Sequence, residues 1–202
     1  MKTTLGLLRH GQTDWNIEFR LQGITDVPLN ATGLAQAHAA AGRINGSDWD
    51  ALLASPLSRA LDTARIVHRV SGIAVDEVLV DEILLERSFG EAEGELYADW
   101  KAKHTGDPLG AESREALTAR VQSFLASVAS TYRGQRVLAV SHGAFIREVL
   151  DVVSLGALPP AGERISNACL NVFECDAEGN WTSYKGVGYV GMAAFAEMKL
   201  EE

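Results

Sequence analysis

Short runs of consecutive apolar residues alternate along the chain with longer segments in which apolar residues recur every three to four positions. The short runs predict buried strands, and the longer periodic segments predict helices with one buried face. Strands are predicted over residues 4–9, 51–54, 74–80, 136–141, 167–175 and 181–187. Helices are predicted over residues 31–45, 57–71, 95–104, 112–132 and 143–153.

The order of these elements predicts the fold class. Strands that alternate with helices favour an α/β protein, here a three-layer α/β/α sandwich with a mostly parallel central sheet. The last two strands follow one another directly and predict a hairpin through residues 176–180. Ser55 followed by Pro56 is typical of a helix start, with Ser as the N-cap, which places Arg59 in the first helical turn.

Composition narrows the class of protein. The 202 residues match the length of one domain, and no linker-like stretch interrupts them, so residues 1–202 are expected to form a single domain. Eighteen basic residues against 27 acidic ones give a net charge of −9, which disfavours nucleic acid or an anionic membrane as the partner. No apolar run approaches a membrane span and no signal-peptide pattern opens the chain, so a cytoplasmic protein is expected. Cys169 and Cys175 fall on one face of a predicted strand, too far apart to bridge, and are predicted to be buried thiols.

Two of the apolar strands end in the same dipeptide. His10-Gly11 follows the first strand, and His142-Gly143 follows the strand over 136–141. Because ligands bind beyond the carboxyl ends of parallel strands, both histidines are expected at one rim of the sheet. Arg59 and Glu86 also follow predicted strands, and we expect them at the same rim.

These residue types suit the cleavage of a phosphate monoester, which needs a nucleophile, cations around the phosphoryl oxygens and an acid for the leaving group. A neutral His10 imidazole can attack near pH 7 without further activation. Arg9, Arg59 and a protonated His142 would hold the phosphoryl group. Glu86 would protonate the leaving group and then take a proton from the attacking water.

The segment Leu8-Arg9-His10-Gly11-Gln12-Thr13-Asp14-Trp15-Asn16 resembles the signature of the histidine phosphatase superfamily, which includes the cofactor-dependent phosphoglycerate mutases. The similarity continues in family order through residues 20–23, 26–29, 55–60, 86–94, 110–113 and 140–143. It covers the chain from about residue 5 to 145 and implies a phosphoglycerate mutase-like fold.

The resemblance also implies roles for individual residues. His10 is then the phosphorylated residue, Glu86 the proton donor and acceptor, and Arg9, Arg59 and His142 the phosphate pocket. The remaining residues expected to contact the substrate are Asn16, Gln22, Gly23, Arg87 and Gly143. The family hydrolyses phosphate esters without a metal or organic cofactor, and none is expected here. The substrate is expected to be a small-molecule phosphate monoester whose leaving group the sequence leaves open.

Two other functions stay open beside hydrolysis. Arg87 directly after Glu86 is the mutase pattern, but the segment between Glu86 and His142 is too short for the extra helical segment that mutases carry there. A more open site admits water, so hydrolysis is preferred over phosphoglycerate mutase activity. The third interpretation is a catalytically silent phospho-ligand binding protein. It is disfavoured because every residue that the chemistry requires is present. A homodimer is possible through an edge strand or through the tail, where Met192, Phe195 and Met198 have helical spacing.

Overall fold

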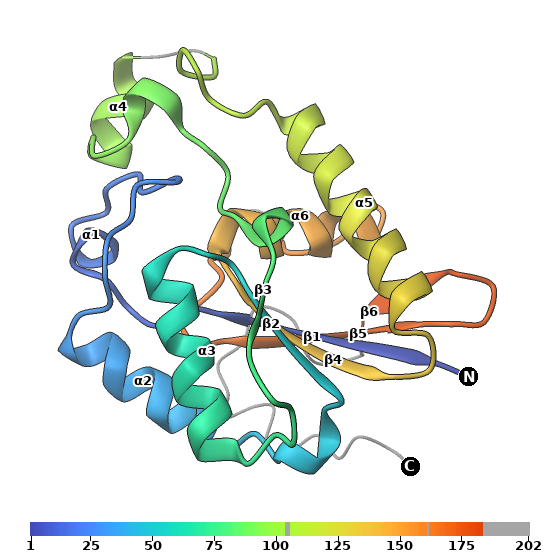
Figure 1. Cartoon of the computed structure of the whole chain (residues 1–202). Coiled ribbons are helices and arrows are strands. Elements are labelled where there is room, and N and C mark those ends of the chain that lie inside the picture. Colours follow the sequence, from blue (N-terminus) through green and yellow to red (C-terminus); the bar gives the residue numbers. More distant parts are fainter. Residues whose placement is uncertain (104–105, 161, 184–202) are drawn as a thin grey trace.

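The computed structural model describes residues 1–103, 106–160 and 162–183. The strands are β1 Thr3–Arg9, β2 Ala51–Ala54, β3 Leu79–Val80, β4 Arg136–Ser141, β5 Leu170–Cys175 and β6 Trp181–Ser183. The helices are α1 Asp14–Ile17, α2 Ala31–Ala41, α3 Ser58–Ser71, α4 Tyr97–Lys103, α5 Arg114–Thr131 and α6 Gly143–Val153 (Figure 1). Single-turn helices lie at Gly46–Asp48, Glu82–Leu84 and Gly90–Ala92.

The described strands form one sheet in the order β3-β2-β4-β1-β5-β6. The pairings β1–β4, β2–β4 and β2–β3 are parallel, whereas β5 runs antiparallel to β1 and to β6. The sheet is therefore mostly parallel, as the sequence predicts. β5 and β6 form the expected hairpin, whose Asp176 N–H donates to the Asn180 carbonyl at 3.1 Å.

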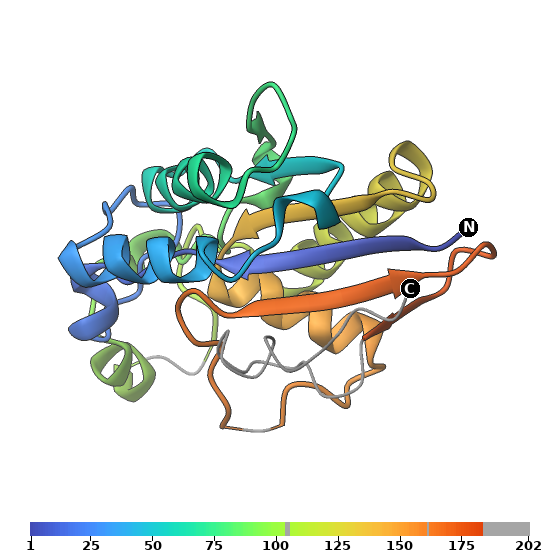
Figure 2. The ribbon, with the colours of Figure 1, turned by 90° about the horizontal axis from the view of Figure 1, so that it is seen from below.

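Helices cover both faces of the sheet (Figures 1 and 2). α2 and α3 pack with Leu8, Leu52 and Leu138 in one apolar core. α5 and α6 pack with Leu5 and Leu7 in the other core on the opposite face. Neighbouring positions of β1 thus enter opposite cores, as the alternation of side chains along a strand requires. This confirms the three-layer α/β/α architecture.

Several predicted boundaries are wrong at the ends of elements. The strand predicted over 74–80 is paired only at Leu79–Val80, where β3 is a solvent-exposed sheet edge. The predicted Ser55 N-cap is also wrong, because α3 begins at Ser58 and the Asp26 carboxylate accepts the Ser58 N–H at 2.8 Å. The strand predicted from residue 167 begins at Leu170, since the segment before it turns across the end of β1, where the Ala168 N–H donates to the Arg9 carbonyl at 3.1 Å.

Other sequence predictions lie wholly or partly outside the described residues. The predicted strand 181–187 is described only as far as residue 183, and the spacing of Met192, Phe195 and Met198 falls beyond it. Within the described ranges, no helix combines the length and the apolar character that a membrane crossing needs.

Both cysteines are buried thiols, as predicted. Burial raises the pKa of the Cys169 thiol to about 12, and burial also raises the pKa of Cys175. Because the thiolate is the reactive form, the raised values make both side chains chemically inert packing groups.

The pairing of β1 with β4 sets the position of the site. Arg9 lies opposite Ser141 in the register, so His10 and His142 leave adjacent parallel strands side by side. The His10 N–H donates to the Ser141 carbonyl at 3.0 Å and fixes this relation. The Ser55 N–H donates to the Val140 carbonyl at 3.0 Å, which brings the carboxyl end of β2 to the same rim.

Candidate active site

His10 is held at the carboxyl end of β1 with one ring nitrogen engaged and the other available. Its Nδ1 lies 2.6 Å from the Gly11 carbonyl oxygen, and a carbonyl only accepts, so Nδ1 carries the proton and Nε2 the lone pair. Burial, followed by the charges of Arg59 and Arg9, lowers the pKa of His10 well below its ordinary value. The imidazole is therefore neutral at pH 7, the form in which it can attack phosphorus.

A close backbone contact fixes the turn that follows His10. A Cβ on Gly11 would lie 2.3 Å from the Gly33 carbonyl oxygen, and one on Gly33 would lie 2.0 Å from the Gln12 carbonyl oxygen. Only two glycines allow the start of α2 to approach the His10 turn this closely. The Gly11 N–H in turn donates to the Thr63 hydroxyl at 3.2 Å, which ties the turn to α3.

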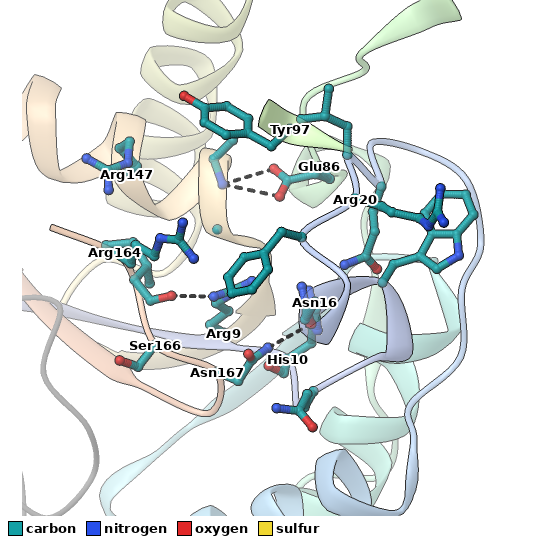
Figure 3. Close-up of a pocket in the computed structure, with 18 of the residues that line it drawn as sticks. Arg9, His10, Asn16, Arg20, Glu86, Tyr97, Arg147, Arg164, Ser166 and Asn167 are labelled. Atoms are coloured by element: carbon teal, nitrogen blue, oxygen red, sulfur yellow. Dashed lines mark hydrogen bonds between the residues drawn. The ribbon is translucent and has the colours of Figure 1, made fainter. Parts of the chain in front are cut away.

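Two arginines with buried guanidinium groups flank His10. Arg59 is fully buried in the first turn of α3 and donates to the carbonyls of Thr25 at 2.8 Å and Gly23 at 2.7 Å. Arg9 donates through Nη1 to the Ile165 carbonyl (Figure 3). Burial lowers the pKa of Arg9 to about 10 and also lowers that of Arg59, and in each case the nearby carboxylate of Glu86 opposes the shift. Arg9 thus stays charged at neutral pH.

Glu93 holds the loop whose carbonyls receive Arg59. Its carboxylate accepts the N–H groups of Ile24 at 3.0 Å and Thr25 at 2.9 Å. Gly23 has φ +53°, and a Cβ there would lie 1.9 Å from Glu93 Oε1, so the loop requires glycine. Glu93 was not among the predicted site residues, although it lies within the 86–94 segment of the family resemblance.

His142 lies directly beside His10, with ring centroids 5.1 Å apart. Its Nε2 lies 2.8 Å from the Ser55 hydroxyl, so Ser55 joins the site beside α3. Burial and the charges of Arg59, His10 and Arg9 lower the pKa of His142 well below its ordinary value. His142 is therefore neutral in the protein without substrate, and the protonated form expected around a bound phosphate stays a prediction.

Three buried nitrogens at this rim have no hydrogen-bond partner among the described residues. They are Nε of Arg9, Nε of Arg59 and Nδ1 of His142. A buried polar group left without a partner costs about 1–3 kcal/mol, so a bound group that pairs with these nitrogens is favoured. The two arginine nitrogens are donors, and Nδ1 of His142 is also a donor when the ring is protonated, which fits a ligand rich in acceptor oxygens, such as a phosphoryl group.

Glu86 joins the site from the loop between the single-turn helices Glu82–Leu84 and Gly90–Ala92. Its carboxylate accepts the N–H of Arg87 at 2.9 Å, that of Ala144 at 3.1 Å and that of Phe145 at 3.2 Å. The last two belong to the first turn of α6, where the helix dipole favours a negative charge. Two carboxylate oxygens offer about four lone-pair positions, so Glu86 retains the capacity to bind a proton.

These groups meet in a cavity of about 1090 Å³ at the carboxyl ends of the strands. It is lined by eight of the predicted site residues: Arg9, His10, Asn16, Gln22, Gly23, Arg59, Glu86 and Gly143. His142 does not line it and acts from beneath the surface, beside His10. Arg9 passes over Gly143, where a Cβ would lie 3.4 Å from Arg9 Nε.

Arg87 is the predicted site residue that the structure does not bring to the cavity. Its Nε donates to the Glu112 carbonyl at 2.8 Å, and its Nη2 pairs with the Asp107 carboxylate at 2.5 Å. The guanidinium thus fastens the 107–112 segment and does not line the cavity, and the contact of Arg87 with substrate stays a prediction.

Sequence reasoning missed the part of the cavity built after α6. Asn167 donates to the His10 carbonyl and to Asn16 Oδ1, both at 3.1 Å (Figure 3). Arg164 lies in the same segment, and Arg147 reaches the cavity from α6. The segment 162–167 has no apolar periodicity and follows the last recognisable motif, so no sequence signal could place it here.

Within the described ranges, no group of three His, Cys, Asp or Glu side chains is placed to hold a metal ion. The site instead combines a neutral imidazole, unpaired cationic and imidazole nitrogens, and one carboxylate. At the rim of a mostly parallel sheet, this combination defines an α/β enzyme of the phosphoryl-transfer class.

Comparison with known proteins identifies the family. The model of the histidine phosphatase superfamily (branch 1) matches residues 5–185, and the chain belongs to this family. PhoE of Bacillus subtilis (strain 168), an uncharacterized phosphatase, is 38% identical over 181 residues, covering 89% of this chain and 91% of that protein. The resemblance inferred from the sequence is thereby confirmed.

Phosphatases and mutases both occur among the relatives. A solved mycobacterial glucosyl-3-phosphoglycerate phosphatase in complex with VO3 superposes with a TM-score of 0.76 at 30% identity, covering 90% of this chain and 96% of that one. A 2,3-bisphosphoglycerate-dependent phosphoglycerate mutase of Gloeobacter violaceus is 32% identical over 197 residues, covering 88% of each chain. The phosphatase relatives support phosphoester hydrolysis as the reaction of this chain.

Proposed function

We propose that this protein hydrolyses small-molecule phosphate monoesters through a phosphohistidine formed on His10. One observation carries the proposal. A buried, neutral His10 lies beside His142 and within the field of Arg9 and Arg59, and Nε of both arginines and Nδ1 of His142 have no partner within the described residues. A phosphoryl group bound there would place its oxygens against the donors and its phosphorus against Nε2.

In the first half-reaction the His10 lone pair forms the Nε2–P bond while the bond from phosphorus to the leaving oxygen breaks. The protonated Glu86 carboxyl gives its proton to that oxygen, so the alcohol departs neutral. His10 Nδ1–H stays on the Gly11 carbonyl, which stabilises the positive charge that the ring acquires.

In the second half-reaction water attacks phosphorus from the side that the alcohol has left. The Glu86 carboxylate takes a proton from the water, the Nε2–P bond breaks, and its electron pair returns to His10. Inorganic phosphate leaves, and the carboxyl is protonated for the next cycle.

The charge of the bound substrate favours the protonated form of His142. An arriving phosphate dianion adds negative charge to this site. The same charge favours a protonated His142, which adds positive charge beside His10. The protonated His142 expected in the phosphate pocket would thus form when the substrate binds.

Phosphoglycerate mutase activity is the second candidate, because mutases occur among the relatives. The feature of this chain that favoured it was Arg87, whose guanidinium is engaged by Asp107 and Glu112 outside the cavity. Interconversion of 2- and 3-phosphoglycerate that depends on bisphosphoglycerate and outpaces phosphate release would favour the mutase instead.

Phosphate release from a panel of phosphomonoesters tests the proposed function. His10→Ala should lower the rate to background for every substrate, because no covalent route remains. His38→Ala is the matched control, since His38 is exposed on α2 outside the cavity, and it should match wild type. Turnover that survives in His10→Ala would contradict the proposal.

The remaining expectations accompany this proposal. We propose that hydrolysis needs no metal, so that EDTA leaves the rate unchanged. We also propose a cytoplasmic protein of a single domain over residues 1–202, without nucleic-acid or membrane partners and with a possible homodimer. Light scattering at several protein concentrations would test the dimer.

A further inference from the structure

The cavity carries more positive charge than binding of one phosphoryl group uses. Its lining includes five arginines against two carboxylates, counted over the described residues: Arg9, Arg20, Arg59, Arg147 and Arg164 against Glu86 and Glu163. The whole chain has a net charge of −9, so this concentration of guanidinium groups runs against the overall balance. Arginine suits such a site because its planar fork binds carboxylate and phosphate bidentately.

Three of the five arginines have assignments. Arg9 and Arg59 flank His10, as described above. Arg20 pairs with Glu18 at 2.5 Å and donates to the Gly94 carbonyl at 2.7 Å, so it fastens the cavity wall. Arg147 and Arg164 are left without a role in the proposed reaction.

Arg164 is directed across the mouth of the cavity. Its guanidinium carbon lies 4.8 Å from the centroid of the Phe19 ring, which stands on the segment after α1. Phe19 has φ +56°, a conformation that non-glycine residues rarely adopt and that tends to persist where function requires it. Arg164 lines the same cavity as Arg9, and its positive charge contributes, after burial and Arg59, to the lowered pKa of Arg9.

Arg147 supports the same wall from α6. It donates through Nη2 to the carbonyl of Glu163, the residue before Arg164. A carbonyl is neutral, so this bond orients Arg147 without cancelling its charge. No ion pair of Arg147 or Arg164 with a carboxylate occurs within the described residues. Figure 3 shows both arginines on one side of the cavity, opposite Arg20.

The cavity has room for a substrate that reaches this wall. Its volume of about 1090 Å³ is slightly above the range of roughly 300–1,000 Å³ usual for small-molecule sites. A phosphoryl group on His10 occupies only the inner end, and the rest receives the leaving group.

We propose that Arg147 and Arg164 form a second anion-binding subsite, so that the preferred substrate is a phosphomonoester with a carboxylate or second phosphate on its leaving group. This inference rests on the proposed function of the same cavity. It assigns the two arginines to specificity, and it leaves the bond-breaking steps to His10 and Glu86.

Three substrates that differ at one end test the subsite: n-propyl phosphate, 2-carboxyethyl phosphate and propane-1,3-diyl bisphosphate. For one or both compounds with a second anionic group, wild type should have a kcat/KM at least about 10-fold higher than for n-propyl phosphate. The reason is that charge-assisted hydrogen bonds are stronger than neutral ones. The compound with the higher value identifies carboxylate or phosphate as the second group. Equal values for all three compounds would overturn the proposal.

Substitutions then assign the preference to residues. Arg164→Gln and Arg147→Gln should each reduce this preference in kcat/KM by about 10-fold, mainly through a higher KM for the compound with a second anionic group. Arg164→Lys should retain part of it, because the charge remains without the bidentate fork. Arg65→Gln, which alters an exposed arginine on α3 outside the cavity, is the matched control and should keep the wild-type preference. A preference that survives both glutamine substitutions would overturn the assignment.

A binding measurement separates this inference from the proposed reaction. Isothermal titration of His10→Ala with 2-carboxyethyl phosphate, the bisphosphate and n-propyl phosphate requires no turnover. At least one of the two compounds with a second anionic group should bind about 10-fold more tightly than n-propyl phosphate. This result is expected even if wild type hydrolyses none of the three and the proposed function fails. Equal affinities would overturn the subsite while leaving the hydrolysis test unaffected.

Discussion

At the scale of single residues, two neutral imidazoles buried beside arginines make folding sensitive to pH. The pKa values of His10 and His142 are lowered well below 6.5 in the folded chain. As pH falls below 6.5, the unfolded chain binds protons at these positions that the folded chain does not, so stability is lost. Each histidine contributes up to about 1.4 kcal/mol per pH unit in this window.

The difference between variants isolates this effect. Between pH 7.5 and 5.5, His10→Gln should lose less free energy of unfolding than wild type, by about 1 kcal/mol, in urea titrations at both pH values. His38→Gln, at an exposed position on α2, should lose as much as wild type. Equal losses in wild type and His10→Gln would show that His10 is not buried as a neutral ring.

Glu86 combines a structural contact with its proposed chemistry, and a substitution can separate the two. In Glu86→Gln the amide oxygen can still accept the N–H groups of Ala144 and Phe145, but it cannot transfer a proton. We expect kcat for an alkyl phosphate to fall by about 10²–10⁴. The fall for p-nitrophenyl phosphate should be much smaller, because its leaving group needs little protonation. An equal fall for both substrates would indicate that Glu86 serves only to hold α6.

The sequence predicted which residues meet at the site better than how they are oriented. His10, Arg9 and Arg59 follow from strand ends and from one helix start. The charge of His142 and the direction of Arg87 do not, because each depends on partners contributed by distant segments. Arg87 is drawn away by Asp107, and His142 is kept neutral by its burial and by the surrounding cations.

At the scale of elements, α2 is positioned by the contact between Gly33 and the turn after His10. Gly33→Ala would place a Cβ 2.0 Å from the Gln12 carbonyl oxygen, and neither backbone can easily move. We expect a loss of about 1–3 kcal/mol in the free energy of unfolding, typical of overpacking, together with lower kcat because the His10 turn shifts.

Gly42→Ala is the control for this prediction. Gly42 ends the same helix at φ −68°, and a Cβ there would lie 3.6 Å from the nearest atom. Alanine at this position should leave stability unchanged or raise it by about 0.4–1 kcal/mol. A Gly33→Ala variant as stable as Gly42→Ala would contradict the close contact.

The periodicity of the sequence located the buried elements well and the exposed ones poorly. The bounds of β2 and β4 match their predictions, because both strands are covered on both faces and read as continuous apolar runs. The edge strand β3 keeps only two of the seven predicted positions, since an exposed edge leaves no such pattern.

At the scale of the whole molecule, parallel pairing joins chemistry from distant parts of the chain. His10 follows β1, Arg59 follows β2 and His142 follows β4, and the register brings these three strand ends to one rim. The general rule for parallel sheets was sufficient to predict this convergence. The segment 162–167 returns over the rim without regular structure, so the outer wall of the cavity could be found only in three dimensions.

The central claim is that His10 carries the phosphoryl group between the two half-reactions. Wild type mixed rapidly with a ³²P-labelled phosphomonoester and quenched in alkali should retain protein-bound label that is stable to base and released by acid. Mass spectrometry should place this phosphate on the peptide containing His10, and His10→Ala should retain none. Label that persists in His10→Ala, or that maps to another residue, would contradict the account.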